Sequence, residues 1–348
     1  MNSGFEAAKA ALAETTRPLQ EADASLLLRE IYGVSASVTT LNSEMESTQM
    51  AACGDGAVYV LKTARTPGAS ASFQLQSALL LQLAESCGFA VPRLIATRHG
   101  DAMFEHRLAD GQVLWGYLQT LAEGESSDQL SLTSYEQTRL ATAYAHLSRA
   151  MAGIEAPAHV RPVLWHVDSF PRLTSFLRYV EDRALADDLQ VAMDRFAAST
   201  LPKLRALPWQ VVHNDANPQN IFVSKRTGRP RFSFIDFGDA CRSPRLCDLA
   251  SLCAHRVMDP DDPVGALEPL IRGYASVIRF TELERLLLCE LVIARQAALL
   301  LINAWRAQLH PKDRSYIEKN CERNRRGLRF LLSQDGRRLA ERVHRITQ

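Results

Sequence analysis

The sequence has 348 residues, with 40 Lys and Arg against 39 Asp and Glu and a hydrophobic content of 47%. This length predicts two domains or one large two-lobed enzyme, and the apolar fraction can build a sizeable core, which excludes a disordered chain. A net charge of +1 argues against a dedicated nucleic-acid-binding protein, because such proteins usually carry a marked basic excess. The near balance conceals one asymmetry, since residues 312–348 hold eleven basic and five acidic residues.

The cysteines and the apolar stretches indicate the compartment. Seven cysteines occur without a CxxC pair, which is typical of reduced thiols in the cytoplasm rather than of a zinc site or a disulfide framework. The N-terminus shows no basic segment followed by an apolar run, so no signal peptide is expected. The most apolar stretch, residues 286–303, is interrupted by Glu290 and Arg295, which makes it too polar for a membrane span. We therefore expect a cytoplasmic protein with no membrane partner.

The first third of the chain predicts a sheet with one inserted helix. Residues 5–33 have helical spacing and end at Gly33, a common helix stop. A CGDG segment at residues 53–56 predicts a hairpin turn, because glycine accepts positive φ. A helix is expected over residues 72–86 from its leucine stripe. Strands are expected at residues 38–41, 48–53, 58–61, 92–96, 102–106 and 113–121.

The remainder of the chain predicts helices with three short strands among them. Helices are expected at residues 131–151, 169–180, 187–207, 246–256, 264–277, 281–309 and 312–332. Strands are expected at residues 209–212, 220–223 and 230–235. A β-rich front followed by a helical back indicates an α+β fold with a cleft between two lobes. We place the nucleotide-binding N-terminal lobe at residues 1–120 and the catalytic, helical lobe at residues 121–348.

Two motifs carry the chemistry, HNDANPQN at residues 213–220 and FIDFGDA at residues 234–240. Phosphoryl transfer depends mainly on positioning and on neutralising charge. One carboxylate must accept the proton of the attacking hydroxyl, a second must hold Mg²⁺, and an amide oxygen can complete the metal site. Asp215, Asp236 and Asn220 fit these roles in that order. His213 either braces the loop by hydrogen bonding or takes part in catalysis.

Lys62 ends the string YVLK and is one of six lysines in the chain, so it is the candidate cation for the nucleotide phosphates. Kinases usually pair this lysine with a glutamate on the following helix. Here that helix has no acid before Glu85, and Gln76 occupies the place of the partner. No G-x-G-x-x-G string is present. The polar segment 42–48 could cover the phosphates or be an ordinary hairpin loop, and its candidate ligands are Asn42, Ser43, Ser47 and Thr48.

The strings HNDANPQN, FIDFGDA and YVLK resemble the aminoglycoside phosphotransferase/choline kinase-like family of small-molecule kinases. The resemblance covers about residues 38–256 and is closest in motif to hydroxylysine kinase and to kinase domains fused to aminotransferases. It implies a two-lobed protein-kinase-like fold with Asp215 as catalytic base, Asn220 and Asp236 as Mg²⁺ ligands, and ATP or GTP as co-substrate. It also implies that residues 117–121 form the hinge at the nucleotide base, with Leu118 and Thr120 as contacts.

Substrate identity is the least determined feature of the sequence. A cationic amine would need carboxylates, and the candidates are Asp239, Asp259, Asp261, Asp262, Glu282 and Glu290. A hydroxy amino acid would also need a carboxylate clamp, for which Arg242 or Arg245 could serve. The motif departs from the family pattern just after the metal aspartate, at residues 239–244. Asp248 matches a family aspartate that we expect to hold the catalytic loop through backbone N–H groups.

These observations predict a Mg²⁺-dependent kinase that transfers the γ-phosphate of ATP or GTP to a hydroxyl of a small amine or a hydroxylysine-like amino acid. An aminoglycoside kinase, a choline or ethanolamine kinase, and a nucleotide-binding pseudokinase regulator remain alternatives. A protein kinase is disfavoured, because the glycine-rich loop and an A-P-E string are missing. The expected partners are the small-molecule acceptor and the nucleotide, and the sequence leaves open a monomer or a homodimer.

Overall fold

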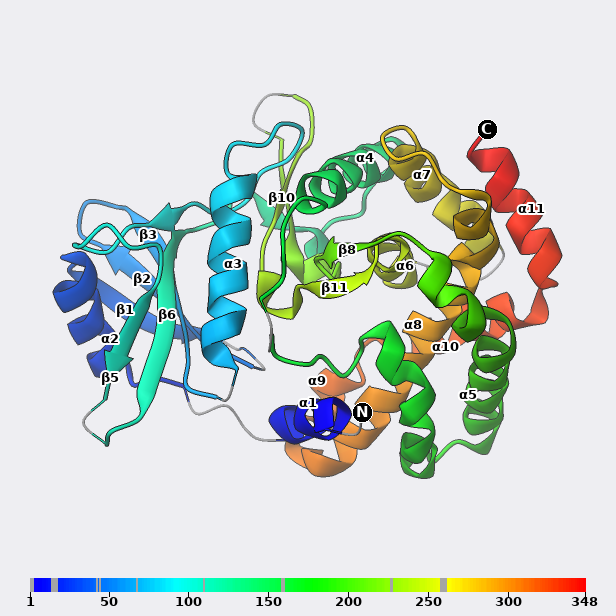
Figure 1. Ribbon diagram of the computed structural model, residues 1–348, viewed down its shortest axis with the longest axis horizontal. Helices are drawn as coiled ribbons and strands as arrows, with labels where there is room; N and C mark the ends of the chain where they lie inside the picture. Colours follow the sequence, from blue (N-terminus) through cyan, green and yellow to red (C-terminus); the bar gives the residue numbers. More distant parts are fainter. Residues whose placement is uncertain are drawn as a thin grey trace.

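The front of the chain is a β-sheet and the back is a set of helices, with a long helix between them (Figure 1). The computed structural model describes residues 3–13, 18–41, 43, 45–66, 68–108, 110–157, 160–225, 228–256 and 262–348. The sheet lobe continues into the helical lobe after β6 (Val113–Thr120), and the intervening helix is α3 (Ala69–Leu83). This arrangement confirms the expected two-lobed α+β fold.

The sheet lobe contains six antiparallel strands in its described residues, in the order β1-β2-β3-β6-β4, with β5 also paired to β6. The strands besides β6 are β1 (Ala36–Leu41), β2 (Ser47–Cys53), β3 (Val58–Ala64), β4 (Leu94–Ile95) and β5 (Phe104–Arg107). All six predicted strands are therefore confirmed. The turn between β2 and β3 has Gly56 at φ +89°, the conformation for which glycine was expected.

Alternating residues of the sheet pack against helices on opposite faces. Tyr117 meets Phe73 of α3 edge to face, with ring centroids 5.3 Å apart. Its neighbour Leu118 is fully buried in a second cluster with residues of α2 (Glu21–Leu27) and of the π-helical turn Leu28–Tyr32 that continues it. This alternation is the two-residue period of a strand whose faces are both covered. It fixes the side of β3 on which Lys62 lies, because Lys62 pairs with Tyr117.

The first helix belongs to the other lobe. α1 (Ser3–Ala13) packs on the helical lobe, where the ring of Phe5 lies 6.2 Å from that of Phe176. This differs from the expected lobe boundary, which placed residues 1–120 together. The sheet faces are already covered by α2 and α3, so the apolar side chains Phe5, Ala8 and Leu12 are buried against the helical lobe instead.

The helical lobe is built around α8 (Glu282–Leu309). By length and composition this helix could cross a membrane, but 83% of its most apolar window is buried inside the protein, so it is a core helix. The other α-helices of the described lobe are α4 (Ser134–Met151), α5 (Arg183–Arg195), α6 (Leu246–Ala254), α7 (Pro263–Ala275), α9 (Arg314–Ile317), α10 (Cys321–Ser333) and α11 (Gly336–Ile346).

Three predicted helices differ in form. The helix expected over residues 187–207 is α5, which ends at Arg195 and is continued by the π-helical turn Phe196–Thr200 and the 3₁₀ segment Leu201–Ala206. The segment expected as a helix over residues 169–180 is a 3₁₀ helix, Val167–Tyr179, and it contains Pro171, which cannot donate the backbone hydrogen bond of an α-helix. The helix expected over residues 312–332 is divided into α9 and α10. The break falls at residues 318–320, which are polar and offer no apolar side chain to the core.

Short strands hold the two motif segments, residues 213–220 and 234–240, against the helical lobe. β8 (Trp209–Val212) leads into the segment 213–220 and pairs with β11 (Cys241–Pro244), which follows the segment 234–240. β9 (Ile221–Ser224) and β10 (Arg231–Phe234) form the hairpin between the motifs, and β7 (Glu125–Ser126) pairs with β9. Because of this pairing, the hairpin brings Asp236 close to Asp215, as predicted. β11 was not predicted, because the sequence CRSP has little strand character.

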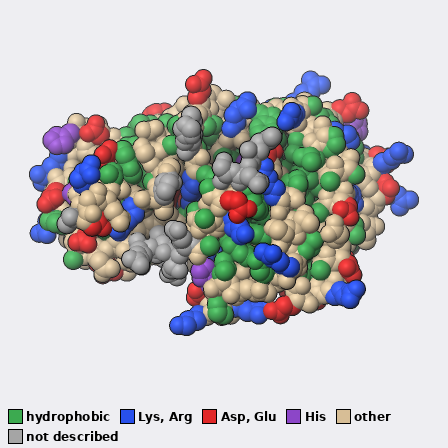
Figure 2. Space-filling view, turned by 60° about the horizontal axis from the view of Figure 1, so that its bottom comes forward, with side chains coloured by type: hydrophobic (Ala, Val, Ile, Leu, Met, Phe, Trp, Pro, Cys, Tyr) green, Lys and Arg blue, Asp and Glu red, His purple; other side chains and the backbone are tan. Residues whose placement is uncertain are grey.

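Several arginines of the basic C-terminal segment pair with acids from elsewhere in the same lobe. Arg329 bonds Asp188 at 2.9 Å and Arg342 bonds Asp262 at 2.8 Å. Over the coloured residues of the face drawn in Figure 2, basic and acidic side chains are interspersed. The Arg-rich helices are thus attached by exposed ion pairs and by a buried stripe that includes Leu331 and Val343.

Candidate active site

A cleft of about 680 Å³ lies between the sheet and the helical lobe and contains the chemistry-bearing residues of both. Thr48 and Lys62 line it from the sheet, and Asp215, Asn220 and Asp236 line it from the two motif segments. Cavities of roughly 300–1,000 Å³ are usual for small-molecule sites. The five residues come from segments far apart in the sequence, and the fold brings them to one cavity.

Asp248 holds the loop that carries Asp215. Its side chain is fully buried and accepts hydrogen bonds from the backbone N–H groups of His213 (3.1 Å) and Asn214 (2.8 Å). These contacts confirm the expected structural role of Asp248. The loop also contains Asn214 at φ +67°, a left-handed conformation that Asn tolerates better than most residues and that is often found at functional sites.

His213 braces the same loop from inside. Its Nε2 lies 2.9 Å from the carbonyl oxygen of Ile235, and its Nδ1 accepts a hydrogen bond from the backbone N–H of Asp215 at 3.3 Å. A neutral ring with the proton on Nε2 satisfies both contacts. His213 is 1% exposed and ties the two motif segments together, so the bracing alternative fits its contacts.

Both carboxylate oxygens of Asp215 are engaged. Oδ2 accepts hydrogen bonds from the amide nitrogens of Asn217 (2.6 Å) and Asn220 (2.8 Å), and Oδ1 lies 3.2 Å from the guanidinium of Arg295. Burial raises the pKa of Asp215, and the Arg295 charge opposes that increase. Arg295 comes from α8 and was not predicted as a site residue, although a charge within the most apolar helix was a signal for it.

Lys62 lies inside β3 and bonds two acids. Its Nζ is 2.6 Å from Asp236 Oδ1 and 3.1 Å from Glu46 Oε2. Burial alone would lower the pKa of Lys62, but the charges of Asp236 and Glu46 raise it well above its ordinary value, so the ammonium is retained. Asp236 has φ +64° and also accepts the N–H of Gly238.

Glu46 takes the place that was expected for a helix residue. The amide nitrogen of Gln76 donates to Glu46 Oε1 at 2.8 Å, and the hydroxyl of Tyr117 donates to the carbonyl oxygen of Gln76 at 2.8 Å. Gln76 therefore acts on Lys62 through Glu46 rather than directly. Glu46 lies in the predicted phosphate-covering segment, but its role was missed because the partner of Lys62 was sought on the helix.

Of the remaining residues expected to bind the nucleotide, some line the cleft and one is bonded elsewhere. Ser43 and Thr48 line the cleft, whereas the Ser47 hydroxyl accepts the backbone N–H of Leu19 at 2.9 Å. Asn42 lies outside the described residues.

In the predicted hinge, the residues that line the cleft are not the predicted contacts Leu118 and Thr120. Leu118 is fully buried in the sheet core, and the Thr120 hydroxyl accepts the N–H of Arg93 at 3.0 Å. The cleft at this position is lined by Gln119, Leu121 and Ala122.

Of the substrate candidates that the structure describes, one lies in the cleft, and residues 259–261 lie outside the described residues. Asp239 lines it and pairs with Arg161 at 2.9 Å. Glu290 is outside the lining and bonds Arg195 at 2.8 Å, and the guanidinium of Arg242 lies over the Trp209 ring, 5.8 Å from its centroid. These two placements correct the sequence expectation, because each side chain is bound by a neighbour that the sequence pattern did not reveal. Arg245 likewise bonds Glu284 at 2.7 Å.

The cleft offers oxygen donors suited to a hard cation. The Asp236 carboxylate and the Asn220 amide flank the cavity, and neither Asp236 Oδ2 nor Asn220 Oδ1 accepts a hydrogen bond from a described residue. Mg²⁺ favours one or two such protein oxygens, with water and substrate phosphates completing its shell. These two oxygens fit Mg²⁺ held jointly with a nucleotide. Within the described residues, no group of three or more His, Cys, Asp or Glu is arranged for a metal.

Comparison with known proteins agrees with this geometry. Residues 37–288 match the family model described as phosphotransferase enzyme family. Mouse hydroxylysine kinase is 21% identical over 320 residues, which cover 85% of each chain.

Solved structures share the fold. A microcompartment-associated aminopropanol kinase matches with a TM-score of 0.68 and 21% identity over 90% of this chain and 99% of its own. An amicoumacin kinase in complex with AMP-PNP and Ca²⁺ matches with a TM-score of 0.67 and 13% identity over 92% and 97%. The family match spans most of the chain and includes every motif residue of the cleft. The chain therefore belongs to the phosphotransferase enzyme family and is a small-molecule kinase that acts on a hydroxyl group.

Proposed function

We propose that this kinase uses Mg²⁺ and the γ-phosphate of ATP or GTP to phosphorylate a hydroxylysine-like amino acid or a small amino alcohol in the cytoplasm. The observation that carries the proposal is the joint placement of Asp215, Asn220 and Asp236 in one cleft opposite Lys62. The name of the mouse relative and of the aminopropanol kinase support this acceptor class. Aminoglycosides are a second candidate, because another structural neighbour is a phosphotransferase in complex with kanamycin.

Each residue has a defined task in this proposal. Asp215 Oδ2 already accepts two hydrogen bonds and Oδ1 accepts one, so Oδ1 is the oxygen that can take the proton from the attacking hydroxyl. Asn217 and Asn220 hold the carboxylate in place. Lys62 binds the nucleotide phosphates as a buried ammonium. Asp236 and Asn220 would hold Mg²⁺, which supplies neutralisation of the phosphate charge.

The test is an ADP and GDP release assay with hydroxylysine, amino alcohols and aminoglycosides as acceptors. Asp215→Asn keeps the shape of the side chain but removes the base, and we expect kcat to fall about 10²- to 10⁴-fold. Asp23→Asn, on the exposed surface of α2, is the matched control. Chelation of Mg²⁺ should abolish turnover, and added Mg²⁺ should restore it.

The outcomes separate the alternatives. Unchanged turnover in Asp215→Asn would refute the assigned base. Nucleotide binding without transfer to any acceptor would instead favour the pseudokinase alternative. Preference between ATP and GTP is read from the same assay, by comparing kcat/KM for the two nucleotides.

A further inference from the structure

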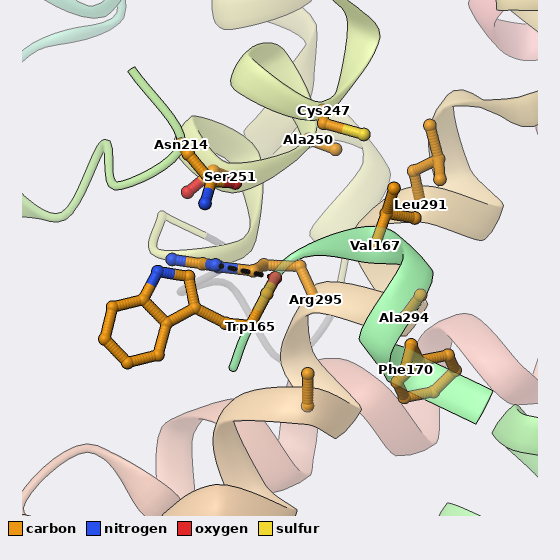
Figure 3. Close-up of a pocket in the computed structure, with 11 residues that line it drawn as sticks. Trp165, Val167, Phe170, Asn214, Cys247, Ala250, Ser251, Leu291, Ala294 and Arg295 are labelled. Atoms are coloured by element: carbon orange, nitrogen blue, oxygen red, sulfur yellow. Dashed lines mark hydrogen bonds between the residues drawn. The ribbon is translucent and has the colours of Figure 1, made fainter. Parts of the chain in front are cut away.

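A small second cavity lies next to the main cleft at Arg295, the residue that bonds Asp215. Its walls come from the 3₁₀ segment Val167–Tyr179, from α6 and α8, and from the catalytic loop (Figure 3). Most of the lining is apolar. The aliphatic and phenyl side chains in it are Val167, Phe170, Ala250, Leu291, Ala294 and Ala298. Trp165 and Arg295 line both this pocket and the main cleft, so the two spaces adjoin at these side chains.

Four polar atoms in this otherwise apolar pocket lack partners. Asn214 Nδ2, Ser251 Oγ, Arg295 Nε and Trp165 Nε1 are buried and make no hydrogen bond to any described residue. Asn214, Ser251 and Arg295 are each more than nine-tenths buried. Buried polar atoms without partners are uncommon in native proteins, so these four atoms are available to a group that enters the pocket.

The hydrogen-bonding capacity of these four atoms indicates what kind of group they could bind. The nitrogen atoms of Asn214, Arg295 and Trp165 can only donate, and the Ser251 hydroxyl can donate as well. In Figure 3 the side chains of Asn214 and Ser251 lie on one side of the Arg295 guanidinium and the Trp165 indole nitrogen lies on the other. Arg295 is the one charged residue among the eleven that line the pocket, all of which the structure describes. Asn214 and Ser251 present donors on one side of this cation and Trp165 presents one on the other, an environment suited to an oxyanion and not to an amine.

The size and position of the pocket indicate which oxyanion it can bind. Its cavity volume is about 30 Å³, and a water needs about 10–15 Å³ in this measure, so the pocket has room for two water-sized atoms. That matches the two oxygens of a carboxylate and is too small for a phosphate group with its further oxygens. The same Arg295 lies 3.2 Å from Asp215 Oδ1, so a group bound here places the rest of its molecule beside the catalytic base.

We propose that this pocket binds a carboxylate of the acceptor, and that the physiological acceptor is therefore a hydroxy acid or hydroxy amino acid whose hydroxyl reaches Asp215. The proposal rests on the kinase activity proposed above and deepens it. It replaces Arg242 and Arg245 as the expected carboxylate clamp with Arg295, Asn214, Ser251 and Trp165. In the main cleft, the described acids Glu46, Asp215, Asp236 and Asp239 each pair with a cation of the protein, which leaves none dedicated to an amine.

The experiment uses acceptor pairs that differ only by the carboxylate: threonine with aminopropanol, serine with ethanolamine, and hydroxylysine with its decarboxylated diamino alcohol. The readouts are kcat/KM for phosphate transfer and the Kd from calorimetry with a non-hydrolysable nucleotide present. We expect the carboxylate member of at least one pair to be favoured about 10- to 100-fold, as for charge-assisted hydrogen bonds. Ser251→Ala and Trp165→Phe each remove one donor and should reduce that ratio about tenfold.

Ser77→Ala is the matched control, because Ser77 is also a buried serine without a hydrogen-bond partner but lies on α3, outside the pocket. It should leave the ratio unchanged. Transfer to amino alcohols as fast as to their carboxylate partners, or ratios that do not change in both pocket variants, would overturn the carboxylate pocket and indicate that it holds only water. Carboxylate binding that weakens in both variants, without transfer to any acceptor, would support the pocket and refute the kinase proposal instead.

Discussion

The contact between Glu46 and Lys62 yields the sharpest quantitative prediction. The two atoms Nζ and Oε2 are 3.1 Å apart, and both side chains are only 7% exposed, so solvent screens the interaction little. Glu46→Gln keeps the shape of the side chain and removes its charge. A hydrogen bond to a charged group contributes about 1.5–3 kcal/mol, and each 1.4 kcal/mol is about tenfold. Lys62 would then be held by Asp236 alone and would compete with Mg²⁺ for it.

We therefore expect kcat/KM for the nucleotide to fall about 10- to 150-fold, with a higher Mg²⁺ requirement. The assay is nucleotide diphosphate release over a Mg²⁺ titration, normalised to folded protein by thermal unfolding. Glu85→Gln, at an exposed acid two residues after α3, is the matched control. A folded Glu46→Gln protein with kcat/KM within about twofold of wild type would refute the reasoning, because Asp236 would then suffice to position Lys62.

Three further predictions concern stability. Asp248→Ala leaves two buried N–H groups without an acceptor, at a cost of about 1–3 kcal/mol each, so calorimetry should show a Tm several degrees lower; an unchanged Tm would contradict this. Gly116→Ala places a Cβ 2.5 Å from the Lys62 carbonyl oxygen and should destabilise β3 by about 1–3 kcal/mol, whereas Gly54→Ala, with open space around it, should not. Hydrogen bonds from Lys225 and Thr133 lower the pKa of Glu136 to about 2. Its contribution is therefore present above the unfolded pKa of 4.5 and is lost as the pH falls toward 2; acid unfolding of Glu136→Gln, followed by circular dichroism, should lack this component.

Local sequence patterns were sufficient for the strands of the sheet and for the motif residues. Alternation of apolar residues and the CGDG turn indicate the β2–β3 hairpin, because side-chain period and glycine φ are properties of a few consecutive residues. Asp215, Asn220 and Asp236 were found for a similar reason. They lie within 22 residues of one another, and their spacing on one loop and one hairpin is readable without knowledge of the rest of the fold.

Only the tertiary structure revealed the residues that act on these motifs from a distance. Arg295 reaches Asp215 across 80 positions of sequence, Glu46 reaches Gln76 across 30, and α1 packs on the lobe that follows it rather than on its own sheet. Residue periodicity and motif spacing do not predict such contacts. They depend on which face of each helix is buried in the core and which face lines the cleft. The sequence by itself determined a kinase-like lobe pair and the motif residues Asp215, Asn220 and Asp236, whereas the packing of α8 and the 3₁₀ segment decided how Asp215 is held and which pocket lies near it.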